Sequence, residues 1–308
     1  MNTFKEIPKF KEGTCVTIGK FDGVHLGHVS LLEELVLAAE LNQMESVVFT
    51  FDPYPEEFFK GEEILKINTK GEIISQMDEI GVDNLIRVEF DEKFSQYDPT
   101  KFIKDVLVGK LCAKMIICGP DVSFGKDGSG NLELLMSLQD KYGYEVVEVE
   151  KEIYQGNAIS SSRISKAIEE GKMEDANEML GYDYYLYGPV VTGQGLGHTY
   201  DIPTVNINPT KGRIIPAKGV YFTIVEVDDK EYQAVTNVGV RPTVSDENTI
   251  NIESHILNCE DGADFYGKRI RVYFLHHSRG EMRFETSDIL FKQIKKDVDD
   301  ALRFFESV

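Results

Sequence analysis

The chain has 308 residues, 42% of them hydrophobic and 28% charged, and its formal net charge is -20 at pH 7. This length and composition indicate a globular protein with one large domain or two ordinary ones, and with a sizeable core. The acidic balance argues against nucleic acid as a partner, because nucleic acid is bound through basic patches, and no apolar run approaches the length needed to span a membrane.

The first half of the chain alternates apolar runs with segments of helical spacing. The apolar runs lack the alternation of half-exposed strands, which is typical of parallel strands buried on both faces. We therefore predict an α/β domain with a parallel sheet. Its strands are expected at residues 14–18, 46–51, 84–89, 114–118 and 145–149, and its helices after residue 28 and at 69–81, 99–108, 132–138, 164–171 and 173–180.

A glycine-containing loop, residues 19–28, joins the first strand to the first helix; we call it the histidine loop. His25 and His28 flank Gly27 where the helix begins. The start of a helix exposes free backbone N–H groups and a positive dipole end, which suits a bound phosphate. Two histidines at this spacing can donate to the same phosphate, so the pattern favours a phosphate site over two polar loop residues.

Two more loops follow strands, at residues 51–55 and 119–125. Ligands of parallel sheets bind beyond the carboxyl ends of the strands, so we expect all three loops to converge on one cleft. Ser161, Ser162 and Arg163 stand at a further helix start, as a redundant N-cap or as ligands of phosphate. Because the chain also contains the histidine loop, the interpretation as phosphate ligands is favoured.

Beyond residue 181 the pattern changes to strands in close succession, punctuated by glycine and proline. Strands are expected at residues 184–191, 219–227, 232–238, 250–257 and 268–275. This pattern predicts a small antiparallel β-barrel, and the amphipathic helix at 288–305 should pack on it. We therefore expect two domains, residues 1–182 and 183–308.

The cysteines indicate a reducing compartment. They form no C-x-x-C pair, and three of them lie in apolar runs, so we expect reduced core residues of a cytoplasmic protein. Residues 1–13 are polar and charged and do not resemble a signal peptide. The four cysteines are Cys15, Cys112, Cys118 and Cys259.

Four ordered motifs of the first half belong together. They are Gly-x-Phe-Asp-Gly-Val-His-Leu-Gly-His from Gly19, Thr-Phe-x-Pro-x-Pro from Thr50, the group Gly119, Asp121, Phe124 and Gly125, and Ile-Ser-Ser-Ser-Arg-Ile from Ile159. With them the chain resembles, over nearly its whole length, the bifunctional riboflavin kinase/FAD synthetase family of bacteria. The resemblance implies a Rossmann-like nucleotidyltransferase domain that adenylylates FMN to FAD.

The second half resembles the riboflavin kinase barrel of the same family, with its C-terminal helix. The matching pieces are Gly193 and Gly197, Pro-Thr-Val-Asn from Pro203, Asn-Val-Gly from Asn237, Glu253 with His255, and Arg279 with Glu281. The resemblance implies that ATP phosphorylates riboflavin to FMN in this half, before a second ATP adenylylates FMN.

The resemblance also implies catalytic roles. His25 and His28 would hold the ATP phosphates and the charge that develops in adenylyl transfer, while the FMN phosphate, mostly ionised at neutral pH, is the nucleophile. Glu253 would be the general base of the kinase; by pattern alone it is a solvent-facing strand residue. Thr204 and Asn206 would be Mg²⁺ ligands; by pattern alone they are turn residues.

The remaining implied contacts are to ATP and flavin. They comprise Gly19, Phe21, Asp22, Gly27, Ser161, Ser162 and Arg163 for ATP in the adenylyltransferase, Asp121 and Phe124 for flavin there, Gly193, Gly197, Thr204 and Asn206 for ATP in the kinase, and Arg279 and Glu281 for flavin in the kinase.

The chain departs from the family pattern at several positions. Asp201, where the family has glycine, places a negative charge near a loop that should meet ATP phosphates. Lys20 replaces a usual Asn or Ser and is able to serve as a phosphate ligand. The other departures are His198, Val205, Tyr54 and Gly128.

Three functions stay open. The leading one is the bifunctional enzyme, the second an FMN adenylyltransferase whose barrel only binds flavin, and the third a non-catalytic flavin-binding regulator. An adenylyltransferase for another cofactor precursor would leave the C-terminal motifs unexplained. Expected partners are ATP, flavins and Mg²⁺, with no nucleic acid or membrane, and with weak self-association left open.

Overall fold

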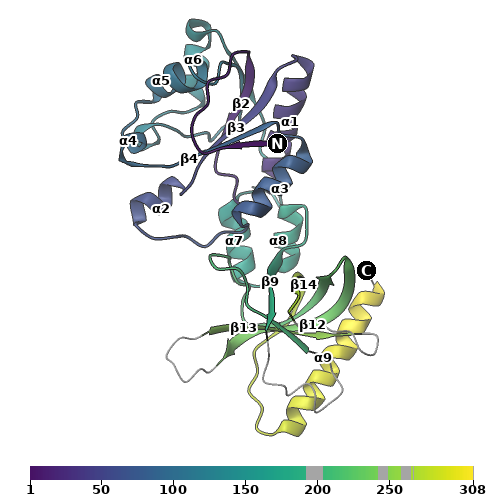
Figure 1. The fold of residues 1–308 in the computed structure, drawn as a ribbon. Coiled ribbons are helices and arrows are strands. Elements are labelled where there is room, and N and C mark those ends of the chain that lie inside the picture. The colour runs from purple at the N-terminus through teal and green to yellow at the C-terminus, as the bar shows by residue number, and fades with distance from the viewer. Residues whose placement is uncertain (192–203, 242–248, 258–264, 266, 308) are drawn as a thin grey trace. The chain divides into compact units, whose positions relative to one another are not determined.

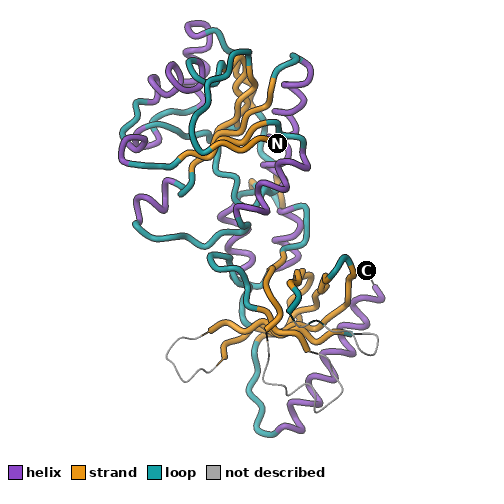
Figure 2. The backbone as a smooth tube through the Cα atoms, viewed as in Figure 1, coloured by secondary structure: helices purple, strands orange, loops and turns teal. Residues whose placement is uncertain are grey.

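The computed structural model describes residues 1–191, 204–241, 249–257, 265 and 267–307 (Figures 1 and 2). The chain divides into two compact units, Met1–Ser161 and Ser162–Val308, and each is described by itself. The boundary expected between residues 182 and 183 stays a prediction. Among the described helices, none is long and apolar enough to cross a membrane.

The first unit contains a six-stranded sheet whose neighbouring strands are all parallel, which confirms the predicted α/β class. Its strand order is β1-β4-β3-β2-β5-β6. The chain thus leaves β2 first toward β3 and later returns to its other side with β5. Such a topological switch places a ligand crevice beyond the carboxyl ends of β2 and β5. The strands are β1 (Asn2–Phe4), β2 (Thr14–Ile18), β3 (Glu45–Phe51), β4 (Asn84–Val88), β5 (Ala113–Cys118) and β6 (Glu145–Glu148).

Hydrophobic clusters cover both faces of this sheet. Successive β2 residues point to opposite faces, so Cys15 belongs to one cluster and Val16 to the other. Helices α1 and α3 pack into the Cys15 cluster, and η1 and α6 into the Val16 cluster (Figure 1). The helical segments are α1 (Leu26–Leu41), α2 (Pro55–Lys60), α3 (Lys70–Ile80), α4 (Glu92–Ser95), α5 (Pro99–Lys101), the π-helical η1 (Phe102–Val108), the 3-10 turn η2 (Lys126–Gly128) and α6 (Leu132–Tyr142).

Local sequence signals explain where α3 begins and ends. The Thr69 hydroxyl accepts a hydrogen bond from the Glu72 backbone N–H at 3.3 Å, and the Glu72 carboxylate accepts one from the Thr69 N–H at 2.6 Å. This capping box satisfies two N–H groups that have no partner inside the helix. Gly81 ends the helix in the left-handed conformation, with φ of 99°.

The second unit contains a closed barrel of antiparallel strands in the order β10-β13-β12-β11-β14-β9, which confirms the predicted barrel. The C-terminal helix α9 packs on it, with Ala301 buried against Phe222 and Leu257. The strands are β9 (Tyr185–Val191), β10 (Thr204–Ile207), β11 (Gly219–Val227), β12 (Lys230–Arg241), β13 (Thr249–Ile256) and β14 (Arg269–Gly280); the helices are α7 (Ser161–Glu169), which begins at the last residue of the first unit, α8 (Met173–Leu180) and α9 (Ser287–Ser307).

Three hydroxyl groups form a buried hydrogen-bonded row across β11, β12 and β13. The Thr223 and Thr236 hydroxyls are 2.6 Å apart, and those of Thr236 and Ser254 are 2.7 Å apart. All three side chains are buried. Their mutual hydrogen bonds offset the free-energy cost of burying polar groups.

Several short elements were not predicted, because each is too short to show a hydrophobic period. The most important is β10, which places Thr204 and Asn206 on a barrel strand rather than in a turn. The others are β1, α2, α4, β7 (Ile153–Tyr154) and β8 (Asn157–Ala158).

Candidate active sites

The histidine loop ends in a stacked pair of imidazole rings. His25 is the N-cap of α1, and its Nδ1 accepts a hydrogen bond from the His28 backbone N–H at 3.3 Å. The two rings stack with their centroids 3.7 Å apart. A Cβ atom at Gly27 would lie 3.3 Å from the His25 ring, so a small residue is favoured there. Because Nδ1 of His25 is an acceptor, its neutral ring carries its proton on Nε2, which can donate to an anion.

Both histidines are held neutral near pH 7. Burial lowers the pKa of His25 to about 4. Burial and the neighbouring His25 lower the pKa of His28 as well, while a hydrogen bond between its ring and the Lys20 backbone acts in the opposite direction. The Nδ1 atom of His28 is buried and has no hydrogen-bond partner. The neutral His25 ring can donate to phosphate through Nε2, whereas the single proton of neutral His28 is used at the Lys20 backbone, so His28 can donate through Nδ1 only after it gains a second proton.

The lowered pKa of His25 predicts a loss of stability in mild acid. Because the pKa of His25 is about 4 in the folded chain and that of a free histidine is 6.5, the unfolded chain binds more protons between these pH values. The free energy of unfolding is expected to fall by about 2 kcal/mol through this group between pH 7 and pH 5. His25→Asn keeps an N-cap acceptor but does not titrate. In urea unfolding, the fall in the free energy of unfolding from pH 7 to pH 5 should therefore be smaller in this variant by that amount. An equal fall in the free energy of unfolding in the original chain and in His25→Asn would contradict the prediction.

Asp22 and Ser161 hold the histidine loop in place. The Asp22 carboxylate is buried and accepts hydrogen bonds from the backbone N–H groups of Ile67, at 3.0 Å, and Asn68, at 3.3 Å. Burial raises the pKa of Asp22, and these hydrogen bonds act against that rise. The Ser161 hydroxyl donates to the Asp22 carbonyl at 2.8 Å. The carboxylate and the hydroxyl of these two expected ATP contacts are thus occupied within the chain.

The other expected ATP contacts are divided between the two units. The Phe21 ring is buried, and a Cβ atom at Gly19 would lie 3.1 Å from it, so these residues shape the turn after β2. Ser162 and Arg163 follow Ser161 in α7 and open the second unit.

The three loops converge on one cavity of about 300 Å³, as expected. Gly19 and Lys20 come from the histidine loop, the second loop contributes Phe51, Tyr54 and Pro55, and the third contributes residues 123–125. Aromatic rings dominate the lining, which suits a flat conjugated ligand. These aromatic residues are Phe51, Tyr54, Phe59, Phe90, Phe94, Tyr97, Phe102 and Phe124.

Of the two expected flavin contacts, only Phe124 lines this cavity. Its backbone pairs with Gly130, and a Cβ atom at Gly130 would lie 2.4 Å from the Phe124 ring. Asp121 instead pairs with Lys151 at 2.9 Å, and its side chain is 72% exposed. The sequence patterns missed most of the aromatic lining, although several of its members cluster at residues 51–59 and 90–102.

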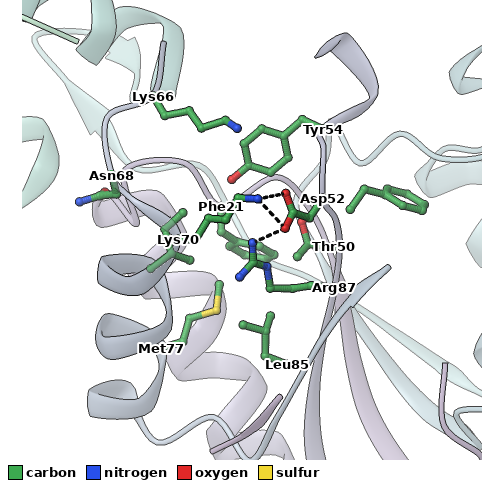
Figure 3. A pocket seen from close by; sticks show the side chains of 12 residues that line it. Phe21, Thr50, Asp52, Tyr54, Lys66, Asn68, Lys70, Met77, Leu85 and Arg87 are labelled. Carbon is green, nitrogen blue, oxygen red and sulfur yellow. Dashed lines mark hydrogen bonds and ion pairs between the residues drawn. The ribbon is translucent and has the colours of Figure 1, made fainter. Parts of the chain in front are cut away.

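A smaller pocket of about 20 Å³ lies beside the cavity and shares Thr50, Phe51 and Tyr54 with it (Figure 3). Figure 3 shows Asp52 between two cations, with oxygen–nitrogen distances of 2.6 Å to Lys70 and 2.7 Å to Arg87. The Thr50 hydroxyl is buried and has no hydrogen-bond partner. These ion pairs brace the loop after β3, on which Tyr54 stands.

The barrel aligns several expected kinase residues in one row. Glu253 of β13 lies opposite Asn206 on one side and Asn237 on the other. Val220 lies next to Asn237 in β11, and Arg279 lies next to Val220 in β14. Residues directly opposite one another share a face of the sheet, so this row is one surface. Thr204, two residues before Asn206, belongs to the same face.

Glu281 extends this surface next to Asn237. A Cβ atom at Gly239 would lie 2.8 Å from Glu281 Oε1 and 3.2 Å from Asn237 Nδ2, so both side chains border Gly239. Asn237 was not assigned a role from sequence, although it belongs to the Asn-Val-Gly motif. Gly193 and Gly197, like His198 and Asp201, lie outside the described residues.

Arg279 is engaged with α9. Its Nε and Nη2 atoms donate to the two oxygens of Asp297, at 3.0 and 2.7 Å, and this carboxylate is buried. This two-bond geometry fixes the guanidinium group and holds α9 against the barrel. The side chain expected to contact flavin anchors the terminal helix, and its flavin contact stays a prediction.

Comparisons with known proteins find matches for both halves of the chain. A family model described as FAD synthetase matches residues 7–163, and one described as riboflavin kinase matches residues 180–305. The Escherichia coli K12 bifunctional riboflavin kinase/FMN adenylyltransferase is 33% identical over 297 residues, covering 96% of this chain and 94% of that protein. The Listeria monocytogenes protein of the same name is 31% identical over 292 residues, covering 94% and 92%.

The chain is also similar to a solved structure. A crystal structure from Streptococcus pneumoniae, described as a macrolide-efflux protein, has a TM-score of 0.84 and 29% identity, covering 96% of this chain and 97% of that one. This likeness supports the combination of an α/β sheet and a barrel in one chain.

Proposed function

Because the chain belongs to the family of bifunctional riboflavin kinase/FMN adenylyltransferases, we propose how its residues share the two reactions. The chain phosphorylates riboflavin to FMN and adenylylates FMN to FAD. Each reaction is assigned to one unit, since the FAD synthetase match ends at residue 163 and the riboflavin kinase match begins at residue 180.

In the adenylyltransferase, the aromatic cavity receives the flavin ring and the histidine loop receives the ATP phosphates. The observation that carries this assignment is that the cavity is bordered by Gly19 and Lys20, at the start of that loop. A flavin stacked among the aromatic side chains would direct its phosphate toward the two histidines.

The chemical step is an attack by an oxygen of the FMN phosphate on the α-phosphorus of ATP. The bond between the α-phosphorus and the oxygen that bridges to the β-phosphate breaks, and pyrophosphate leaves. The nucleophile has a pKa near 6 and is ionised at neutral pH, so no strong base is needed. Positioning alone can be worth about 7–11 kcal/mol. His25 and His28 donate to the charge that develops. A role of Ser162 and Arg163 at the triphosphate stays a prediction from the sequence.

In the kinase, Glu253 takes the proton of the ribityl hydroxyl as its oxygen attacks the γ-phosphorus of ATP. The bond from the γ-phosphorus to the β-phosphate oxygen breaks, and ADP leaves. Asn206 and Asn237 flank Glu253 in the barrel row and are able to hold phosphate or hydroxyl groups beside it.

The same row fits a magnesium ion. Thr204 and Asn206 offer a hydroxyl and a carboxamide oxygen on one face of β10, and the Glu253 carboxylate lies directly opposite Asn206. Such hard oxygen ligands suit Mg²⁺, which would offset the negative charge of the ATP phosphates. Groups of three or more His, Cys, Asp or Glu residues able to hold a metal are absent from the described part of the chain.

We also propose that the enzyme works in the cytoplasm. Cys15, Cys112 and Cys118, the described cysteines, are free thiols, which suits a reducing compartment. The acidic charge supports small-molecule partners over nucleic acid or anionic membranes. Weak self-association stays a prediction.

One assay tests the whole assignment. The purified chain is incubated with ATP and Mg²⁺ and with either riboflavin or FMN, and the flavins are separated by chromatography. FMN should form from riboflavin, and FAD should form from FMN. FAD formation without riboflavin phosphorylation would select the monofunctional adenylyltransferase, and the absence of both products would leave a flavin-binding regulator.

A further inference from the structure

Lys20 belongs to the histidine loop and reaches the aromatic cavity. It is the second residue after β2 and lines the cavity. Its ammonium group is 5.2 Å from the centre of the Tyr54 ring and 3.0 Å from Glu56 Oε2. Among the described residues that line the cavity, Lys20 is the only one with a positive charge.

The charge of Lys20 also reaches the histidine end of the loop. After burial and His25, the Lys20 charge is a further cause of the lowered pKa of His28. It also acts against the rise that burial produces in the pKa of Asp22. Its backbone is hydrogen-bonded to the His28 ring. One ammonium group thus acts on both the phosphate end and the flavin end of the proposed site.

Building on the proposed adenylyltransferase function, we propose that Lys20 binds the phosphate of FMN, the acceptor in adenylyl transfer. The flavin ring in the aromatic cavity and the ATP phosphates at α1 leave the acceptor phosphate between them, where Lys20 stands. The ammonium group would then donate to a phosphate oxygen and orient it toward the α-phosphorus of ATP.

Glu56 holds Lys20 while no phosphate is present. Their carboxylate–ammonium pair is partly exposed, with side-chain exposures of 32% for Lys20 and 58% for Glu56. Exposed pairs of this kind contribute little to stability, because both charges remain hydrated. A phosphate carries a charge of about -1.5 to -2 near pH 7 and is therefore the stronger partner. Glu56 competes with FMN for the same ammonium group.

The test compares Lys20→Met with Lys20→Arg, and uses Lys104→Met as a control at an exposed lysine outside the cavity lining. Steady-state FAD formation from FMN and ATP is measured, with lumiflavin as a competing ring that has neither a phosphate nor a ribityl hydroxyl. Lys20→Met should raise KM for FMN by about 10- to 100-fold, the loss of one charge-assisted hydrogen bond. The inhibition constant of lumiflavin should not change.

The companion variants sharpen the assignment. Lys20→Arg should restore most of the affinity for FMN, and Glu56→Gln should lower KM for FMN because it frees Lys20. An unchanged KM for FMN in Lys20→Met, an equal weakening of lumiflavin, or a rise confined to KM for ATP would each overturn the proposal. If the unaltered chain forms no FAD, the adenylyltransferase assignment itself fails, and this outcome is separate from a failure of the Lys20 proposal.

Discussion

Replacing His28 with alanine is expected to lower kcat for FAD formation by about 10²- to 10³-fold, the usual effect of removing one donor from developing negative charge. The neutral ring stacks on His25, and its buried Nδ1 atom has no partner, so Nδ1 is available for a hydrogen bond to an anion once it carries a proton. The negative charge of ATP would raise the pKa of His28 and allow Nδ1 to carry a proton. FAD formation from FMN is measured at saturating ATP.

The second activity of the chain is the control for His28→Ala. Riboflavin phosphorylation is assigned to the barrel and should keep its rate in the variant. His28→Asn, whose amide reaches a similar position to Nδ1, should recover part of the lost rate. Full FAD synthesis by His28→Ala would show that the histidine pair is not the phosphate site, and loss of both activities would indicate a folding defect.

Replacing Glu253 with glutamine is expected to lower kcat for riboflavin phosphorylation by about 10²- to 10⁴-fold, the usual contribution of a general base. The amide keeps the shape of the side chain in the row with Asn206 and Asn237 but cannot accept the hydroxyl proton. FMN formation is followed by chromatography at saturating riboflavin and ATP.

Two comparisons separate this role from a structural one. Glu231→Gln, an exposed change on the neighbouring strand β12, should leave the kinase rate unaltered. FAD formation from FMN should be unaffected in both variants. A Glu253→Gln enzyme that phosphorylates riboflavin at the original rate would remove Glu253 from the base role.

The architecture was predictable from sequence because its signals are local. Continuous apolar runs mark the parallel strands, and the Thr69–Glu72 capping box and Gly81 mark the ends of α3. The barrel strands were recognised from their spacing, apart from β10. Its four residues follow a proline and become a strand only because β9 and β13 hold them on both sides.

The site was less predictable, because the hydrogen bonds and ion pairs of its side chains are made with residues distant in the sequence. Asp22 was expected to meet ATP, but its carboxylate accepts from residues 45 and 46 positions later in the chain. Arg279 was expected at the flavin, and its guanidinium is bound to Asp297 of α9. No local sequence pattern predicts such partners. The aromatic cavity was likewise hidden, since its rings come from separate segments that only the folded sheet brings together.

The buried row of the Thr223, Thr236 and Ser254 hydroxyls fixes the register of the barrel strands. Sliding β12 by one residue against β11 or β13 would turn Thr236 to the other face and leave the Thr223 and Ser254 hydroxyls unpaired in an apolar interior. The pairing of β12 with β13 also sets Glu253 opposite Asn237 on the other face. Burial of unpaired hydroxyls therefore destabilises a mispaired barrel, and residues of the barrel interior maintain the alignment of the row proposed for catalysis.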